Sequence, residues 1–213
     1  MKIEKSAMKA MFEMSLKLSP TESCLIITDT IKQEIGKAFY EYAKSISPIT
    51  EIIIMEPTAE HGSEPKPEVA QKMLQFDVQI YATEKSLSHT KARRDACSNG
   101  ARVASMPGIQ IEMINRAINI DYPELKNLQA RIRKILVPGS EVHITTPEGT
   151  DVKTKVTQVH GEVAGDYHKK GDFGNLPTGE VDSGVLEGAT NGVMVFDASM
   201  GGGQGGFGGF GDV

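Results

Sequence analysis

The chain has 213 residues, an ordinary share of charged residues and a formal net charge of -5. A mildly acidic chain has no general attraction to nucleic acid or to an anionic membrane surface. No stretch approaches the ~18 consecutive apolar residues of a membrane-spanning helix, and the charged residues 1–5 lack the apolar core of a signal peptide. The two cysteines, Cys24 and Cys97, are too few for a disulfide framework. We therefore expect a cytoplasmic globular protein with no nucleic-acid and no membrane partner.

The first part of the chain alternates between short apolar runs and segments of helical periodicity. Runs rich in β-branched residues predict buried strands at 24–28, 52–55, 78–82 and 102–106. The spacing of apolar residues predicts helices at 6–18, 31–46, 69–76, 90–98, 109–118 and 123–136. Such alternation with short connections is typical of a parallel sheet covered on both faces. We therefore predict an α/β, Rossmann-like domain over residues 1–139.

Local signals mark the ends of several of these helices. Asp29 or Thr30 can cap the helix that follows the first strand, and Pro67 suits the first turn of the helix at 69–76. One face of the helix at 123–136 is apolar and carries Leu125, Leu128, Ile132, Ile135 and Leu136.

The pattern changes at Pro138-Gly139-Ser140. Two alternating runs, 142–147 and 152–157, flank a short Gly-containing turn and predict a β-hairpin. We therefore assign 140–199 to a β-rich segment. Residues 200–213 are mostly Gly and Phe, a composition that cannot bury enough surface to offset its ordering entropy, so we predict a disordered tail there.

Most signatures of a binding or catalytic site are missing. No G-x-G-x-x-G follows the first predicted strand, and the chain contains no P-loop and no G-x-S-x-G elbow. The histidines fall in no metal-binding spacing; they are His61, His89, His143, His160 and His168. The basic run at 91–94 is more typical of a solvated helix face than of a phosphate site. Carboxylates gather in the β-rich part, where they could bind hard or borderline metals: Asp151, Asp172, Glu180, Asp182 and Glu187.

Several strings resemble one family of metal-dependent peptidases. The string Gly174-Asn175-Leu176-Pro177-Thr178-Gly179-Glu180-Val181 is the most specific, and Gly149-Thr150-Asp151 adds weak support. The run from Ser88 to Arg94 and the turn Met106-Pro107-Gly108 also fit, in the same order. Over most of residues 1–199 the chain resembles the thermophile-type metallo-aminopeptidases, the aminopeptidase T and aminopeptidase S group.

The resemblance implies a two-metal exopeptidase that removes N-terminal residues from peptides and is typically a homodimer. It implies that Glu180 is a metal ligand and that the cofactor is a divalent metal, Zn, Co or Mn. It also implies a peptide substrate and either a homo-oligomer or pairing with a homologous chain. The family's other ligands, a second Glu, two His and an Asp, and a Tyr near the metals, have no matching positions here. We therefore expect a truncated protein whose site, if complete, is completed from outside the chain.

Two further functions remain open from the sequence. The α/β domain could be a non-catalytic binding or assembly module derived from the same family. A related metal-dependent ring-opening oxygenase is a weaker possibility, because the same fold group includes one.

Overall fold

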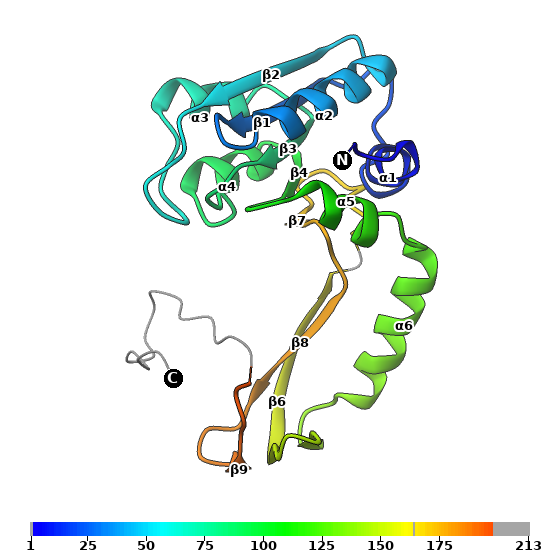
Figure 1. Ribbon diagram of the computed structural model, residues 1–213, viewed down its shortest axis with the longest axis vertical. Coiled ribbons are helices and arrows are strands. Elements are labelled where there is room, and N and C mark those ends of the chain that lie inside the picture. The colour runs from blue at the N-terminus through cyan, green and yellow to red at the C-terminus, as the bar shows by residue number, and fades with distance from the viewer. Residues whose placement is uncertain (1, 164, 198–213) are drawn as a thin grey trace. The chain divides into compact units, whose positions relative to one another are not determined.

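The computed structural model describes residues 2–163 and 165–197 (Figure 1). The tail predicted at 200–213 lies outside the described residues. The chain forms two compact units: unit 1 comprises Met1–Arg131 and Glu162–Glu180, and unit 2 comprises Ile132–Gly161 and Val181–Val213. The sequence predicted one domain boundary near 138–140. In the structure the chain leaves unit 1 after Arg131, returns to it at Glu162 and leaves it again after Glu180.

The centre of unit 1 is a five-stranded parallel sheet in the order β2-β1-β3-β4-β7. The strands are β1 Cys24–Asp29, β2 Thr50–Met55, β3 Val78–Ala82, β4 Arg102–Ser105 and β7 Phe173–Asn175. The register is one to one, so that Ile26 lies beside Ile52 on one side and Ile80 on the other. The first four strands confirm the prediction. The edge strand β7 was not predicted, because it comes from residues that the sequence assigned to the β-rich segment.

Helices precede the first of these strands and connect the later ones. They are α1 Lys5–Lys9 with the π-helix η1 Ala10–Ser15, α2 Gln33–Ile46, α3 Pro67–Met73, α4 Lys91–Ser98, α5 Ile111–Ala117 and α6 Tyr122–Ile135. Pro67 occupies the first turn of α3, as predicted. Thr90 caps α4, because its Oγ1 accepts a hydrogen bond from the backbone N–H of Arg93 at 3.1 Å.

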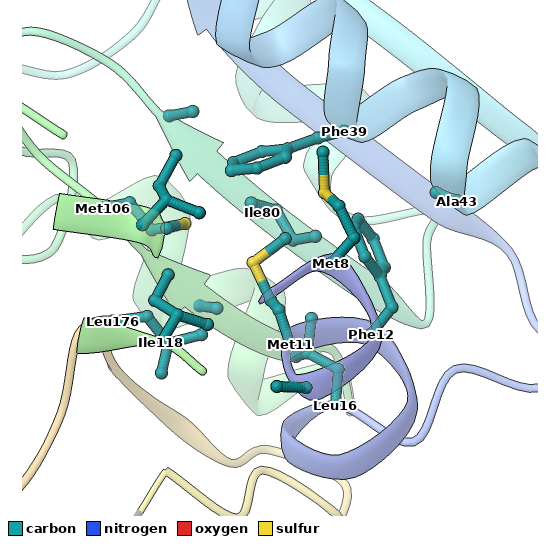
Figure 2. Close-up of a cluster of buried hydrophobic side chains, with 14 of the residues drawn as sticks. Met8, Met11, Phe12, Leu16, Phe39, Ala43, Ile80, Met106, Ile118 and Leu176 are labelled. Carbon is teal, nitrogen blue, oxygen red and sulfur yellow. The ribbon is translucent and has the colours of Figure 1, made fainter. Parts of the chain in front are cut away.

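Both faces of the parallel sheet are packed with apolar side chains. On one face Ile26, Ile80 and Ala104 join residues of η1, α2 and α5 in the larger cluster (Figure 2). On the other face Leu25 and Ile27 pack with residues of α3 and α4. Adjacent residues of β1 therefore serve opposite faces, as the two-residue period of a strand requires. The α/β fold class predicted from the sequence is confirmed.

Unit 2 is built around a second sheet, in which β6 pairs with β5, β8 and β9. These strands are β5 Glu141–Thr145, β6 Asp151–Val163, β8 Glu180–Val185 and β9 Asn191–Val193. Strands β5 and β6 are antiparallel, with Ile144 opposite Val152. This pairing confirms the predicted hairpin.

The apolar face that the sequence predicts for helix α6 is not the face that the helix buries. Its buried residues are Tyr122 and Gln129, whereas Leu128, Ile132 and Ile135 of the apolar stripe are 47%, 37% and 73% exposed. Periodicity identified the stripe but not whether anything covers it. In the described part of the chain no helix is both long and apolar enough to cross a membrane.

Candidate functional site

The string that stood out in the sequence forms the turn between β7 and β8. Leu176 is buried, and the Leu176–Pro177 peptide bond is cis. Gly179 has a φ of 120°, a conformation that side chains of L-residues rarely adopt. A Cβ added there would also lie 3.2 Å from a methyl group of Leu125. Glycine is therefore required immediately before Glu180, where β8 begins.

Hydrogen bonds from buried side chains hold both ends of this turn. The Tyr167 hydroxyl donates to the carbonyl oxygen of Asn175 at 2.8 Å, and burial raises the pKa of the Tyr167 phenol. The Gln129 side-chain amide donates to the carbonyl oxygen of Glu180 at 2.9 Å. The backbone of Glu180 is therefore fixed by α6, while its side chain is left to face outward.

A buried serine links the turn to the end of the neighbouring strand. The Ser88 hydroxyl lies 2.8 Å from the Ser105 hydroxyl at the end of β4 and 3.2 Å from the Asn175 side-chain oxygen. Local sequence patterns do not reveal this contact, because Ser88, Ser105 and Asn175 come from three distant segments. It attaches the start of the turn to the parallel sheet.

The Glu180 side chain is exposed at the edge of a small hollow. The hollow measures about 250 Å³ and is lined by Asn175, Pro177, Thr178, Gly179 and Glu180. Among the described residues, the Glu180 carboxylate forms no hydrogen bond and no ion pair. It is therefore a carboxylate on a fixed backbone that is available to a ligand.

One available carboxylate does not make a metal centre, which requires several ligands held together. Within residues 2–163 and 165–197, no three His, Cys, Asp or Glu side chains come together in a metal-binding group. Other candidates have protein partners: His143 lies 2.7 Å from Asp151, and His168 lies 2.8 Å from the carbonyl oxygen of Met14. The side chain of His160 lies outside the described residues. Glu180 fits the role of one ligand, but the described residues do not supply a set, so no chemical step through a metal follows from them.

Ligands of open parallel sheets commonly bind where the strand order reverses, beyond the carboxyl ends of the strands. In unit 1 that position lies between β1 and β3, and Asp29 occupies it. Its buried carboxylate accepts hydrogen bonds from the backbone N–H groups of Ile31 at 3.1 Å, Lys32 at 2.9 Å and Glu84 at 2.5 Å. The Lys32 ammonium also lies 3.0 Å from the Glu84 carboxylate. The chain's own groups therefore brace this position. Neither predicted residue caps α2, because its N-cap is Lys32, which makes no side-chain capping hydrogen bond; Asp29 holds the turn that precedes the helix.

The basic run at the start of α4 is tied into the protein. Lys91 forms an ion pair with Asp95, and the Arg93 guanidinium lies over the Phe173 ring at 3.9 Å from its centroid. Arg94 donates a hydrogen bond to the carbonyl oxygen of His89 at 2.7 Å. These contacts give the run a structural role.

The chain is similar to one protein family and to solved structures of two enzymes. The model of the family described as NicX, 2,5-dihydroxypyridine 5,6-dioxygenase, matches residues 11–200. The structure of 2,5-dihydroxypyridine dioxygenase from Pseudomonas putida KT2440 is similar, with a TM-score of 0.61 and 13% identity, covering 86% of this chain and 56% of that chain. Wild-type AmpT from Thermus thermophilus is similar with a TM-score of 0.53 and 13% identity, covering 88% of this chain and 62% of that chain. No curated protein matches the chain.

The two solved structures show a shared fold, which supports the aminopeptidase-like architecture in its general form. The chain matches less than two thirds of the length of either of them. The family match is more specific, because it spans nearly the whole chain and includes the turn that carries Glu180. The family expected from the sequence was the metallo-aminopeptidases, and the family shown is a different one that the sequence analysis treated as the weaker possibility. This chain belongs to the NicX family.

Proposed function

We propose that this chain is part of a metal-dependent enzyme of the NicX family, and that Glu180 is one of its metal ligands. The observation that carries the proposal is the Glu180 carboxylate, which is exposed and has no hydrogen-bond or ion-pair partner among the described residues, on a backbone fixed by Gln129. A rigid support for a ligand is what a metal site requires, because its affinity comes from several ligands placed together. The remaining ligands would come from outside the described residues.

The activity that we propose first is oxidative opening of a hydroxylated pyridine ring. The family description and one of the similar structures both name 2,5-dihydroxypyridine as the substrate. Non-haem oxygenases of this general kind use iron(II) held by imidazole and carboxylate ligands. Glu180 would supply a carboxylate of this kind.

The second candidate is hydrolysis of N-terminal residues from peptides. It is favoured by the Asn175–Val181 string and by the similarity to AmpT, an aminopeptidase T. Zinc, cobalt or manganese would then be the metal, acting through an activated water. Both candidates place Glu180 in the same role and differ in the metal and the substrate.

One experiment separates the candidates. The purified chain would be loaded without oxygen with Fe²⁺, or with Zn²⁺, Co²⁺ or Mn²⁺, and its metal content measured. Oxygen uptake with 2,5-dihydroxypyridine and release of leucine from a leucyl amide would then be followed. Glu180→Gln is the test variant, and Glu187→Gln is the control because Glu187 is also an exposed carboxylate of the β-rich segment.

Where the remaining ligands complete the site, we expect metal retention and oxygen uptake with Fe²⁺, both reduced in Glu180→Gln and unchanged in Glu187→Gln. Release of leucine in place of oxygen uptake would favour the peptidase. Equal metal retention by both variants would refute the role of Glu180. Absence of metal and turnover from every sample would favour the non-catalytic binding or assembly module.

A further inference from the structure

Asn175 lies at the carboxyl end of β7 and lines the same small hollow as Glu180. Its backbone is fixed, because its carbonyl oxygen accepts a hydrogen bond from the Tyr167 hydroxyl at 2.8 Å and because it pairs with Ser105 in the parallel sheet. Its side chain is exposed, and the proposed role of Glu180 makes no use of it. The Asn175 amide is therefore a polar group on a rigid support beside the candidate metal ligand.

The buried hydroxyls of Ser88 and Ser105 hold one end of this amide. The Ser88 Oγ lies 2.8 Å from the Ser105 Oγ and 3.2 Å from the Asn175 Oδ1. The two serines are only 3% and 1% exposed. A hydroxyl has one proton and two lone pairs, so Ser88 can donate to Asn175 while it accepts from Ser105. In this arrangement the proton of each serine has an acceptor.

The opposite orientation of the amide is unfavourable. If the Nδ2 group faced Ser88, the Ser88 proton would go to Ser105, and the Ser105 proton would have no acceptor among the described residues. A buried donor without an acceptor is costly, so the side-chain oxygen faces the serines. The NH₂ group of Asn175 is then the end that a molecule in the hollow can reach. No acceptor from the described part of the chain contacts it.

The hollow thus combines a fixed hydrogen-bond donor with a carboxylate. Its volume of about 250 Å³ is below the ~300–1,000 Å³ typical of sites for drug-sized ligands, so it suits a single ring or one amino-acid residue. An amide N–H donates to an oxygen with full or partial negative charge. Both candidate substrates have such an oxygen, as a ring hydroxyl in 2,5-dihydroxypyridine and as the carbonyl of a peptide.

We propose that Asn175 is a substrate-binding residue of the Glu180 site, and that its side-chain N–H donates a hydrogen bond to a hydroxyl or carbonyl oxygen of the bound molecule. The inference rests on the proposed function, because that molecule binds where Glu180 holds the metal. The two residues nevertheless have separate roles. Loss of the Glu180 carboxylate reduces metal retention, whereas loss of the Asn175 amide reduces affinity for the substrate and leaves the metal in place.

NMR of the isotope-labelled full chain, loaded with Zn²⁺ and kept without oxygen, tests the proposal. The chain is titrated with 2,5-dihydroxypyridine or with a leucyl amide. The Asn175 side-chain amide signal, identified by its absence from Asn175→Ala, should shift with one of them, and that ligand distinguishes a ring oxygen from a carbonyl. The dissociation constant should rise about 3–10-fold in Asn175→Ala, as expected for one hydrogen bond, with unchanged zinc content. Asn127→Ala is the control, because Asn127 is an exposed amide of α6 in unit 1, and it should change neither quantity.

Asn175→Asp separates substrate binding from support of the turn, because its oxygen can still accept from Ser88 but it has no N–H to donate. We expect it to bind the ligand no better than Asn175→Ala. Parent affinity in either variant would overturn the inference and leave the role of Glu180 intact. Loss of zinc from Asn175→Ala would also overturn it, because Asn175 would then support the metal. A parent that holds neither zinc nor ligand would overturn the proposed function and this inference with it.

Discussion

The Asp29 carboxylate is a buried hydrogen-bond acceptor at the centre of unit 1. It is fully buried and accepts three backbone N–H groups, two from the turn that leads into α2 and one from the turn after β3. It thereby holds together the carboxyl ends of β1 and β3, two neighbouring strands in the middle of the sheet. We predict that Asp29→Ala destabilises the protein strongly without altering any exposed surface.

The magnitude follows from the groups left behind. Each buried N–H without an acceptor costs about 1–3 kcal/mol, and water can reach some of them because the turn after β1 is partly exposed. Removing the carboxylate also removes its own cost of burial. We therefore expect a loss of about 2–4 kcal/mol in the free energy of unfolding, a large share of the ~5–15 kcal/mol typical of a domain. Asp29→Asn should lose less, because its remaining oxygen can still accept the two N–H groups of the turn.

Urea unfolding followed by circular dichroism measures these losses. The matched control is Asp121→Ala, because Asp121 is exposed and accepts a single backbone N–H, from Glu124 at 2.9 Å, at the start of α6. Losing such a cap costs about 1 kcal/mol. The reasoning is refuted if Asp29→Ala loses no more stability than Asp121→Ala.

Two further predictions concern unit 1. The bidentate contact with the Arg102 guanidinium, at 2.6 and 3.1 Å, lowers the pKa of the Glu22 carboxyl below its ordinary value of 4.5. The contribution of this ion pair to the stability of the fold is therefore complete above pH 4.5 and is lost as the pH falls through the lowered pKa. Glu22→Gln should therefore lower the melting temperature at neutral pH and converge with the parent in acid; a gap that stays constant would contradict this. Gly36→Ala places a Cβ 2.5 Å from the Thr28 side chain, so it should cost about 1–3 kcal/mol by overpacking despite the better helix propensity of alanine. Thermal melting beside the exposed control Lys37→Ala checks it, and equal melting temperatures would refute the contact.

The sequence was a good guide wherever structure depends on near neighbours. The strand at 78–82 coincides with β3, and the strand at 24–28 differs from β1 by one residue. The hairpin of β5 and β6 was also visible, because alternating runs around a Gly-containing turn are a local signal. The local sequence of each of these elements is enough to predict it.

What depended on distant segments could not be predicted. Strand β7 has three residues, and only its pairing with β4 makes it a strand of the parallel sheet. The apolar stripe of α6 was correct as a pattern, yet periodicity does not say which face is covered. At the candidate site, the turn before Glu180 was found from its glycine and proline. The hydrogen bonds by which Tyr167, Gln129 and Ser88 hold this turn depend on the folded structure and could not be predicted. Whether Glu180 binds a metal stays a prediction.

The late arrival of β7 affects how the protein is made and how it can vary. As the chain leaves the ribosome, β4 is the edge of the sheet until the hairpin and then residues 173–175 have been synthesised. An expression product that ends at residue 139 would keep that unfinished edge, although local pattern marks this point as a boundary. The intervening hairpin acts as a closed loop, and doubling the length of a flexible loop costs only about 0.6 kcal/mol. Relatives could therefore exchange or lengthen this segment while keeping the same parallel sheet.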